Sequence, residues 1–384
     1  MIFTKNFIYI SLINFFVLGA YYMLFIVSVP YATEKFQVSS SLGGFAAGLI
    51  LMGCLCGRFV AGKIALTFGF KKLIFTGIIV YIISLALYLA ADNFYLFMAV
   101  RFINGIGIGC IGTVASVLVV HIIPKERHGQ GINYFSLSAV IAMAAGPFLG
   151  MYMMEHVSFD IIFLFCLGIG VASFVFALFV AYPYVKAQQN AKEAFRLSDY
   201  ICYAVIPVTT VTLIVVAGYG SLQAFLPEYA KAVGLTKTAG IFFLIYAAAA
   251  LVSRPFTGKT FDKRGANIII YPSLVMTSIG FMLLSIAKTP VLMILSALFL
   301  GLGMANFQTT IQAVCVKLAK SGLISQAIST YFIFMDFGIG MGPYLYGLLA
   351  PHIGFNGLFA SAAVISAACI LPYYLVYGKR ASFL

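Results

Sequence analysis

Residues 58–72 read RFVAGKIALTFGFKK, and residues 254–268 read RPFTGKTFDKRGANI. An offset of 196 residues places four residues of the first stretch on identical residues of the second: Arg58 on Arg254, Gly62 on Gly258, Lys63 on Lys259 and Gly69 on Gly265. The same offset maps two further regions: Gly105 and Gly107 onto Gly301 and Gly303, and Gly146-Pro147 onto Gly342-Pro343. Because one offset serves three separate regions without a gap, we predict that the chain is a tandem duplication.

The composition excludes an ordinary soluble protein. Of the 384 residues, 63% are hydrophobic and 9% are charged. A soluble domain carries about 25% charged residues. A soluble chain as apolar as this one would expose large hydrophobic patches and aggregate, whereas a bilayer tolerates them. We therefore predict an integral membrane protein.

The apolar residues are arranged in runs that are long enough to cross a bilayer, which takes about 20 residues in a helix. Twelve runs are expected to do so: 6–29, 43–62, 71–91, 94–121, 131–154, 160–183, 199–226, 238–258, 267–287, 290–316, 325–350 and 356–377. The longest internal link contains the polar stretch KAQQNAKEAFR and separates six runs from six. We predict an all-α membrane fold of two pseudo-symmetric six-helix bundles, with the bundles at 1–183 and 199–384 and a cytoplasmic linker at 184–198.

The distribution of basic residues predicts the orientation. With the N-terminus inside, only four of the 23 Lys and Arg residues fall on the outer side: Lys35, Lys231, Lys237 and Lys288. Arg101 falls within a span, and the remaining 18 face the cytoplasm, as the positive-inside rule requires. We expect a monomer in a bacterial cell membrane (inner or plasma), with both termini cytoplasmic and lipid around it. Nucleic acid is excluded as a partner, because its binding needs basic residues gathered on one face.

The repeated loop resembles a glycine-and-basic signature of the major facilitator superfamily of transporters, and the resemblance covers nearly the whole chain. The family usually has an acidic residue where Leu66 stands and a basic one where Thr67 stands. The second copy keeps both, as Asp262 and Lys263. The resemblance implies that these loops take part in an inner gate, and it gives the following gate and motif residues: Arg58, Gly62, Gly69 and Lys71 in the first copy, and Arg254, Gly258, Asp262 and Gly265 in the second.

Two further motifs stand in the spans where this family has them. Arg101-Phe102-Ile103-Asn104-Gly105 is similar to its Arg-x-x-Gln-Gly signature, with Asn in the Gln position. Gly146-Pro147-Phe148-Leu149-Gly150 resembles the Gly-Pro-x-x-Gly signature of the twelve-span drug and metabolite antiporters, which implies export coupled to protons. The motif also has a mechanical interpretation, because proline weakens a helix and glycines allow close helix approach. Ordinary small-residue packing is the structural alternative.

Two charged residues lie well inside predicted spans. Under the offset of 196 residues, Arg101 falls on Ala297 and Asp336 falls on Val140, so each half contributes one charge that the other lacks. Ionisable groups inside a membrane are costly and are functional candidates by default. We expect Asp336 and Arg101 to handle protons or substrate. The structural alternatives are an arginine that fixes helix packing and a hydrogen-bonded acid between helices.

The substrate cavity is expected between the two halves. Polar candidates for its lining are Asn14, Tyr21, Asn104, Tyr219, Gln223, Asn306, Gln308, Gln312 and Tyr331. With many aromatic residues they would form an adaptable apolar pocket that has a few polar anchors. The first span has no acid, which argues against a strictly cationic substrate, and Arg101 could meet an anionic group.

Other classes of function fit less well. The scattered Cys and His residues match no disulfide framework and no metal site, so neither a metal nor a cofactor is expected. No Walker-type loop is present, and no constellation typical of an enzyme stands out. The leading hypothesis is a proton-coupled antiporter that exports a small drug-like molecule or a secreted metabolite such as a metal chelator. A proton-coupled symporter that imports a small nutrient is the alternative, and the duplication favours alternating access over a channel.

Overall fold

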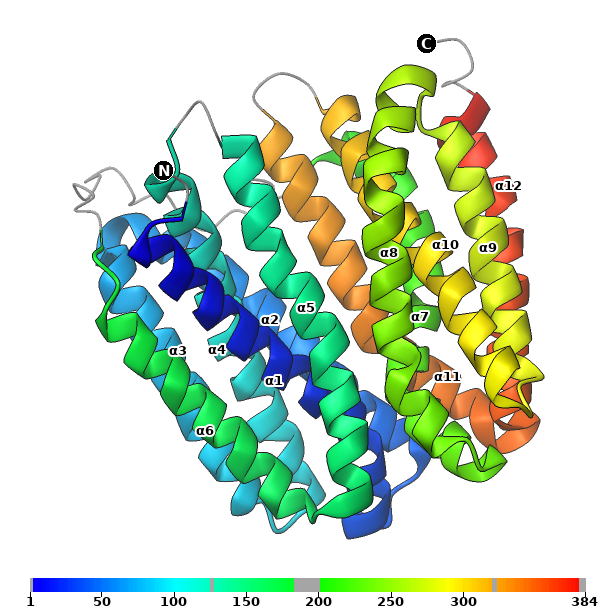
Figure 1. Ribbon diagram of the computed structural model, residues 1–384, viewed down its shortest axis with the longest axis horizontal. Helices are drawn as coiled ribbons and strands as arrows, with labels where there is room; N and C mark the ends of the chain where they lie inside the picture. The colour runs from blue at the N-terminus through cyan, green and yellow to red at the C-terminus, as the bar shows by residue number, and fades with distance from the viewer. Residues whose placement is uncertain (1–2, 125–127, 183–200, 320–322, 380–384) are drawn as a thin grey trace. The chain divides into compact units, whose positions relative to one another are not determined.

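The computed structural model describes residues 3–124, 128–182, 201–319 and 323–379, without side-chain detail for 62–68, 128–130, 132–133, 262 and 325. The described part is helical and contains no β-strand (Figure 1). Its elements are α1 (Lys5–Phe36), α2 (Ser40–Phe68), α3 (Phe70–Leu89), α4 (Phe94–Ile122), α5 (His128–His156), α6 (Phe159–Leu178), η3 (Tyr203–Val205), α7 (Ile206–Val233), α8 (Thr236–Arg264), α9 (Asn267–Ser285), α10 (Pro290–Leu318), α11 (Ile324–Ala368), α12 (Ile370–Tyr373) and η4 (Tyr374–Gly378).

The helices confirm twelve membrane crossings. Eleven described helical segments are long and apolar enough to span, and the last of them, Gln326–Gly378, has 53 residues. At 1.5 Å per residue this segment is about 80 Å long, more than twice the thickness of a hydrocarbon core. It is broken at Gly354, whose φ of 66° lies in the left-handed region that favours glycine. The break falls between the predicted spans 325–350 and 356–377, so this segment crosses twice.

The duplication is visible in where the helices begin and end. α2 and α8 have bounds that differ by 196 residues at both ends, and so do α4 and α10. The side chains of Asn93 and Thr289, again 196 apart, accept the backbone N–H of Leu96 and Leu292 and thereby cap α4 and α10. α2 and α8 are followed by Gly69 and Gly265, which have positive φ values of 80° and 78°. The repeated sequence therefore specifies helices that begin and end at corresponding residues.

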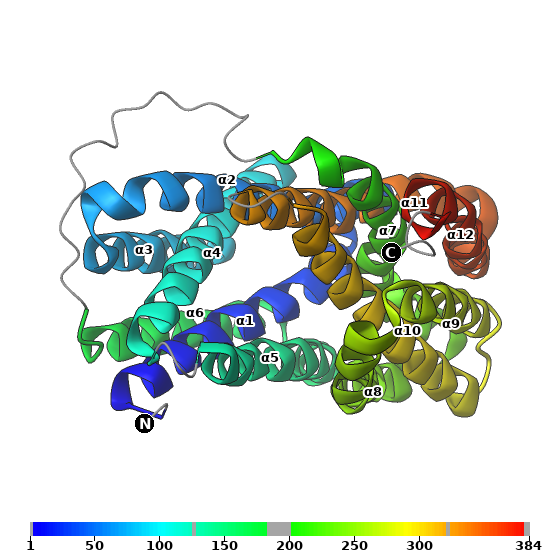
Figure 2. The same cartoon turned by 90° about the horizontal axis from the view of Figure 1, so that it is seen from above.

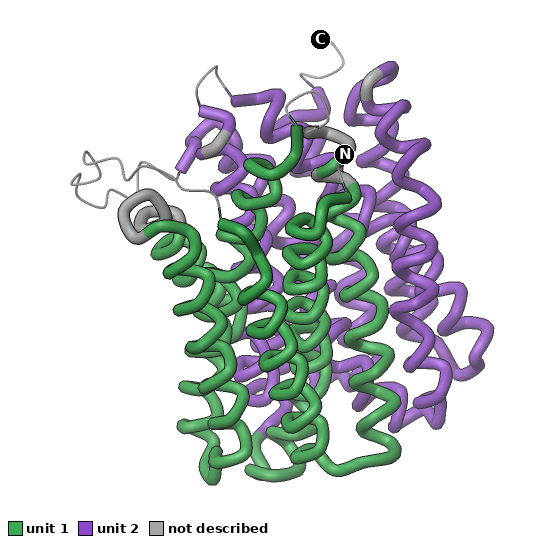
Figure 3. Tube along the Cα trace, turned by 60° about the vertical axis from the view of Figure 1, so that its left-hand side comes forward, with its two compact units in different colours: residues 1–38, 49–193 green, residues 39–48, 194–384 purple. Residues whose placement is uncertain are grey.

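The chain divides into two compact units, which Figure 3 colours separately. Unit 1 comprises Met1–Val38 and Leu49–Glu193, and unit 2 comprises Ser39–Gly48 and Ala194–Leu384. The first turns of α2 belong to unit 2 because they pack on α11. A Cβ atom at Gly44 or Gly48 would collide with the backbone of Pro343 or Gly340, respectively. Glycine is therefore needed where these two helices meet.

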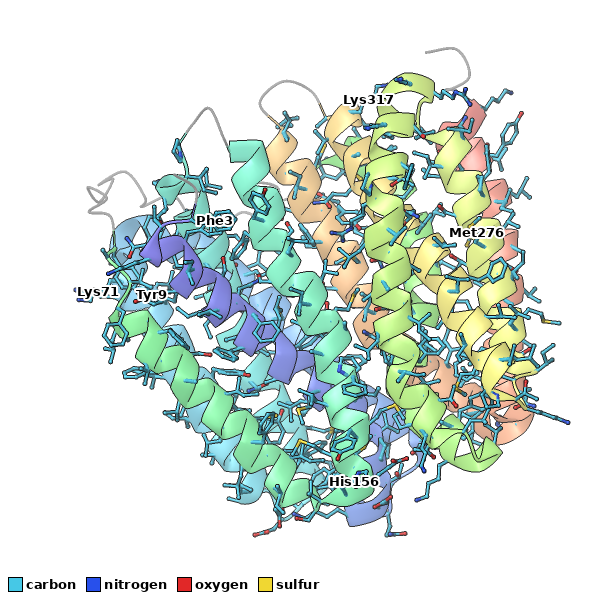
Figure 4. All side chains as sticks on the ribbon, in the orientation of Figure 1. Phe3, Tyr9, Lys71, His156, Met276 and Lys317 are labelled. Carbon is cyan, nitrogen blue, oxygen red and sulfur yellow. The ribbon has the colours of Figure 1, made fainter. Side chains whose placement is uncertain are left out.

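Corresponding pairs of helices pack against each other in the two units. In unit 1, α1 packs against α5 and α3 against α4, while in unit 2 α7 packs against α11 and α9 against α10 (Figure 2). Large apolar side chains cover the outer helix faces, such as Leu178 (58% exposed) and Phe256 (70% exposed), as expected for helices surrounded by lipid. In Figure 4, Lys71 and His156 lie at opposite ends of unit 1.

Candidate functional site

Arg101 is the most deeply buried charge among the described residues of unit 1. Its side chain on α4 is fully buried, and its Nη1 donates a hydrogen bond to the carbonyl oxygen of Leu24 on α1, 3.1 Å away. Ser28 donates to the same carbonyl. The hydroxyl of Tyr88 on α3 is an electrostatic neighbour of the guanidinium. Arg101 therefore ties α4 to α1 beside Tyr88, and in this structure its burial closes it to solvent.

The polar candidates of unit 1 also join helices. Asn14 on α1 donates through Nδ2 to the hydroxyl of Ser138 on α5 at 2.8 Å, and Asn104 on α4 donates to Ser84 on α3 at 2.8 Å. Tyr21 is nearly buried, and its ring contacts those of Tyr22 and Phe25. Because Asn14, Asn104 and Ser138 are buried, these hydrogen bonds pair groups that would be costly in lipid, whereas Oδ1 of Asn104 makes no hydrogen bond among the described residues.

The Gly-Pro-x-x-Gly residues form the contact between α5 and α1. A Cβ atom at Gly146 would lie 2.9 Å from the Cβ of Tyr22 and would also crowd the carbonyl of Gly19. At Gly150 it would meet the side chain of Ile26 at 3.0 Å. Pro147 is buried within α5 and supplies no backbone N–H. The motif thus permits close approach at the point where α5 lacks one helical hydrogen bond.

Asp336 is the most deeply buried acid among the described residues. It lies on α11 with 2% of its surface exposed. Tyr331, on the same helix, is its electrostatic neighbour and donates its hydroxyl proton to the carbonyl oxygen of Gln308 on α10 at 2.9 Å. Asp336 therefore belongs to unit 2 and Arg101 to unit 1, and each has its own set of neighbours.

The other polar candidates of unit 2 lie on α7 and α10. On α7, Gln223 donates through Nε2 to the hydroxyl of Tyr219 at 3.2 Å, and the Tyr219 ring stacks on that of Tyr246 of α8 at 5.5 Å. On α10, Gln308 keeps a buried Nε2 that makes no hydrogen bond within the described part of the chain, and Gln312 is half-buried.

Asn306 forms the densest polar contact of unit 2. Its Oδ1 accepts from the hydroxyls of Ser253 and Thr257 on α8, each at 3.2 Å. Its Nδ2 donates to Ser253 at 2.9 Å and to the carbonyl oxygen of Leu302 at 2.7 Å. The amide therefore fixes α10 against α8.

The gate and motif residues have less uniform surroundings. Gly69 and Gly265 end their helices, a Cβ atom at Gly258 would meet nothing within 4 Å, and Lys71 is exposed. Arg58 and Arg254 are both half-buried. Gly62 and Asp262 lie within α2 and α8, but their surroundings fall outside the detail described.

Sequence reasoning missed several residues that form these contacts, among them Ser84, Ser138, Tyr246, Ser253 and Thr257. The offset of 196 residues held a signal for two of them. Ser253 and Thr257 stand where the first half has Gly57 and Ala61, so a polar group replaces a small residue at two positions on one helix face. Ser84 and Ser138 had no such signal, because serine is common in membrane helices and often bonds its own backbone.

Comparison with known proteins identifies a family. The family model described as Major Facilitator Superfamily matches residues 10–343. The multi-drug resistance efflux pump PmrA of Streptococcus pneumoniae is 23% identical over 374 residues, which cover 92% of each chain. An MFS-type transporter of Methanocaldococcus jannaschii is 24% identical over 346 residues, 85% of this chain and 88% of that one.

Solved structures share the fold. The crystal structure of a mutant of the nucleoside transporter NupG superposes with a TM-score of 0.81 over 97% of this chain and 100% of that chain, at 13% sequence identity. This agreement confirms the predicted fold of twelve helices in two six-helix bundles.

Proposed function

Because the chain belongs to the Major Facilitator Superfamily, we propose that it is a proton-coupled antiporter, which exports small drug-like molecules or a secreted metabolite such as a metal chelator by alternating access. The superfamily and the related structures make the protein a secondary transporter rather than an enzyme. Two observations support export. The relative PmrA, which aligns with 92% of this chain, is an efflux pump, and the Gly146–Gly150 motif resembles the signature of the twelve-span drug and metabolite antiporters.

The burial of Asp336 is the observation on which proton coupling rests. Its carboxyl group is carried by α11 and is buried, whereas Val140 occupies the corresponding position of the other repeat. The fold therefore does not require a charge there. A carboxyl group that is exposed to each side of the membrane in turn can carry one proton per cycle. We assign this role to Asp336, and to Arg101 a supporting role through its contact with α1.

We propose that the protein is a monomer in the cell membrane. Both of its termini lie in the cytoplasm, because the distribution of basic residues predicts that orientation. Its partners are then the small-molecule substrate, protons and lipid. Asn14, Asn104, Tyr219, Gln223 and Tyr331, with the other polar candidates, are proposed to contribute to the substrate path.

A symporter that imports a small nutrient is the second candidate. The observation that favours it is the fold shared with a nucleoside transporter at a TM-score of 0.81. Both candidates use a proton gradient, but the substrate moves in opposite directions relative to the proton.

Transport into sealed proteoliposomes separates the two candidates. Vesicles with an acid interior are diluted into neutral buffer that contains a panel of dyes, antibiotics and metal chelators. An antiporter accumulates its substrate as protons leave, whereas a symporter accumulates substrate only when the outside is the acid side. Protein-free vesicles provide the control for passive trapping. If neither the inside-acid nor the outside-acid gradient drives uptake of any compound, proton coupling is contradicted.

A further inference from the structure

Arg254 lies on the buried face of α8. Residues 243, 247, 250 and 254 follow one another at helical spacing, and Phe243, Ala247 and Ala250 are at most 3% exposed. Arg254 continues this buried row and is half-buried. The lipid-facing side of α8 lies elsewhere, at Val252 and Phe256, which are 67% and 70% exposed. The Arg254 side chain therefore lies on the packed side of α8 and not on its lipid-facing side.

The Nε of Arg254 is buried and makes no hydrogen bond within the described part of the chain. Its electrostatic neighbour is the hydroxyl of Tyr246. Arginine carries five donors, has no acceptor and stays charged in proteins. A buried donor that makes no hydrogen bond costs free energy. An anionic group that enters the site would supply the missing acceptor and a counter-charge.

The surroundings of Arg254 are held in place before any ligand arrives. Ser253 and Thr257, one residue before it and three after it, both donate to Oδ1 of Asn306 on α10. The second side of that amide is satisfied as well, by Ser253 and by the Leu302 carbonyl. The helix that carries Arg254 is thus fixed to α10, and an ordered donor binds a ligand at a smaller entropic cost.

The other repeat shows that the fold does not require this polar set. The positions that correspond to Ser253, Thr257 and Asn306 hold small or apolar residues, namely Gly57, Ala61 and Cys110. The helix contact itself is kept, since the Cys110 thiol donates to the Gly57 carbonyl at 3.4 Å. Arg58 stands at the position of Arg254 but is engaged within the protein. Within the described residues, an arginine with an unpaired buried Nε beside a fixed amide is therefore particular to unit 2.

We propose that Arg254 binds an anionic group, a carboxylate or a phosphate, of the transported molecule. This inference rests on the proposed function only in taking the bound molecule to be the one transported. The planar guanidinium can donate two parallel hydrogen bonds to either group, a geometry that lysine cannot reproduce. A lipid headgroup is disfavoured as the source of the anion, because Val252 and Phe256 place the lipid on a different side of α8.

The test is an equilibrium binding measurement on the purified full-length protein, with 2-naphthoate, 2-naphthyl phosphate and methyl 2-naphthoate as probes. The parent protein should bind at least one anion, and bind it at least about tenfold more tightly than the uncharged ester. R254Q should lose about tenfold or more for that anion and should bind the ester as the parent does. R254K should fall between them, because it keeps the charge but not the paired donors.

Lys259→Gln provides the matched control. It removes one positive charge from the same helix, but Lys259 is exposed. K259Q should bind the anion as the parent does, which separates local contact from a general loss of positive charge. R254K keeps the test valid if R254Q fails to give monodisperse protein.

Three results would overturn the assignment: no anion binding by the parent, equal binding of acid and ester, or anion binding that is unchanged in both Arg254 variants. Loss of copurifying anionic phospholipid from R254Q without loss of probe binding would assign Arg254 to lipid instead. Each of these results can occur while a proton gradient still drives transport, so it leaves the antiporter proposal standing. Conversely, absence of gradient-driven transport with intact anion binding would reject only the antiporter.

Discussion

The two repeats make the same helix contacts with the same glycines. Four contacts form two pairs under the offset of 196 residues: Gly105 with the Ile50 carbonyl and Gly301 with the Tyr246 carbonyl, and Gly107 with the Tyr81 amide and Gly303 with the Thr277 amide. At each of these glycines a Cβ atom would be forced against a neighbouring backbone. The duplication has therefore kept the positions where two backbones approach most closely.

The repeats differ in the side chains that surround these shared contacts. The contact between Cys110 and Gly57 in unit 1 becomes a contact between Asn306 and Ser253 in unit 2. Arg101 and Asp336 likewise correspond to apolar residues, Ala297 and Val140, in the opposite repeat. The comparison teaches that backbone contacts specify the fold, while the polar groups found in one repeat alone are the best candidates for function.

The largest effect is expected at the shared glycines. G105A and G301A should each lower the stability of the protein by about 3 kcal/mol or more, because the added methyl group meets a backbone carbonyl that cannot turn away. G112A is the control, since a Cβ atom at Gly112 would meet nothing within 4 Å. Thermal unfolding and the monodisperse fraction in detergent are the measurements. An unchanged Tm for G105A and G301A would contradict the packing argument.

The second largest effect is expected at Asp336, the buried acid that has no counterpart in the other repeat. D336N should abolish accumulation that is driven by the pH gradient, because an amide cannot release a proton at physiological pH. Exchange of substrate for substrate should survive, and the protein should still fold, since a neutral amide is no harder to bury than the acid. D160N, at an exposed acid in the first turn of α6, is the control and should transport as the parent does. Undiminished pumping by D336N would make Asp336 structural.

Exchanging residues between the repeats should have a smaller, asymmetric effect. C110N places an amide where the Gly57 carbonyl accepts the present hydrogen bond, so we expect a loss of about 1–3 kcal/mol from the groups of the amide that stay unsatisfied. N306C should cost only about 1 kcal/mol. Once the amide is gone, the hydroxyl protons of Ser253 and Thr257 can turn to the carbonyls of Ala250 and Ser253. Thermal unfolding of both variants tests the order, and a more stable C110N than N306C would contradict it.

The smallest effect is expected in the repeated loop. The second copy keeps the acid that the first copy lacks, so D262N should slow transport more than L66N does. Ion pairs at protein surfaces are in general worth about 1 kcal/mol, so we expect at most roughly a fivefold change in rate. Initial rates of uptake into proteoliposomes measure the difference. If both variants keep the parent rate, the acid in the second copy, at the end of α8, has no role in gating.

The number of crossings and the duplication could be predicted from the amino-acid sequence. Every span must bury its own backbone hydrogen bonds and face lipid, so each one needs a local apolar run that can be counted. The glycines could be found in the same way, because Gly105 and Gly301 recur at the fixed offset that also relates the helix ends.

The pairs of polar groups that meet could not be predicted, because they depend on helix packing. Arg101 donates to Leu24, 77 residues away, and Asn14 donates to Ser138, 124 residues away. The same packing engages both sides of the Asn306 amide but leaves the buried Nε of Arg254 without a hydrogen bond among the described residues. Hydropathy fixes how many helices cross the membrane but not how each one is rotated about its axis. Rotation is set by packing between helices far apart in the chain, and it determines whether a polar side chain meets a carbonyl, an amide or an approaching ligand.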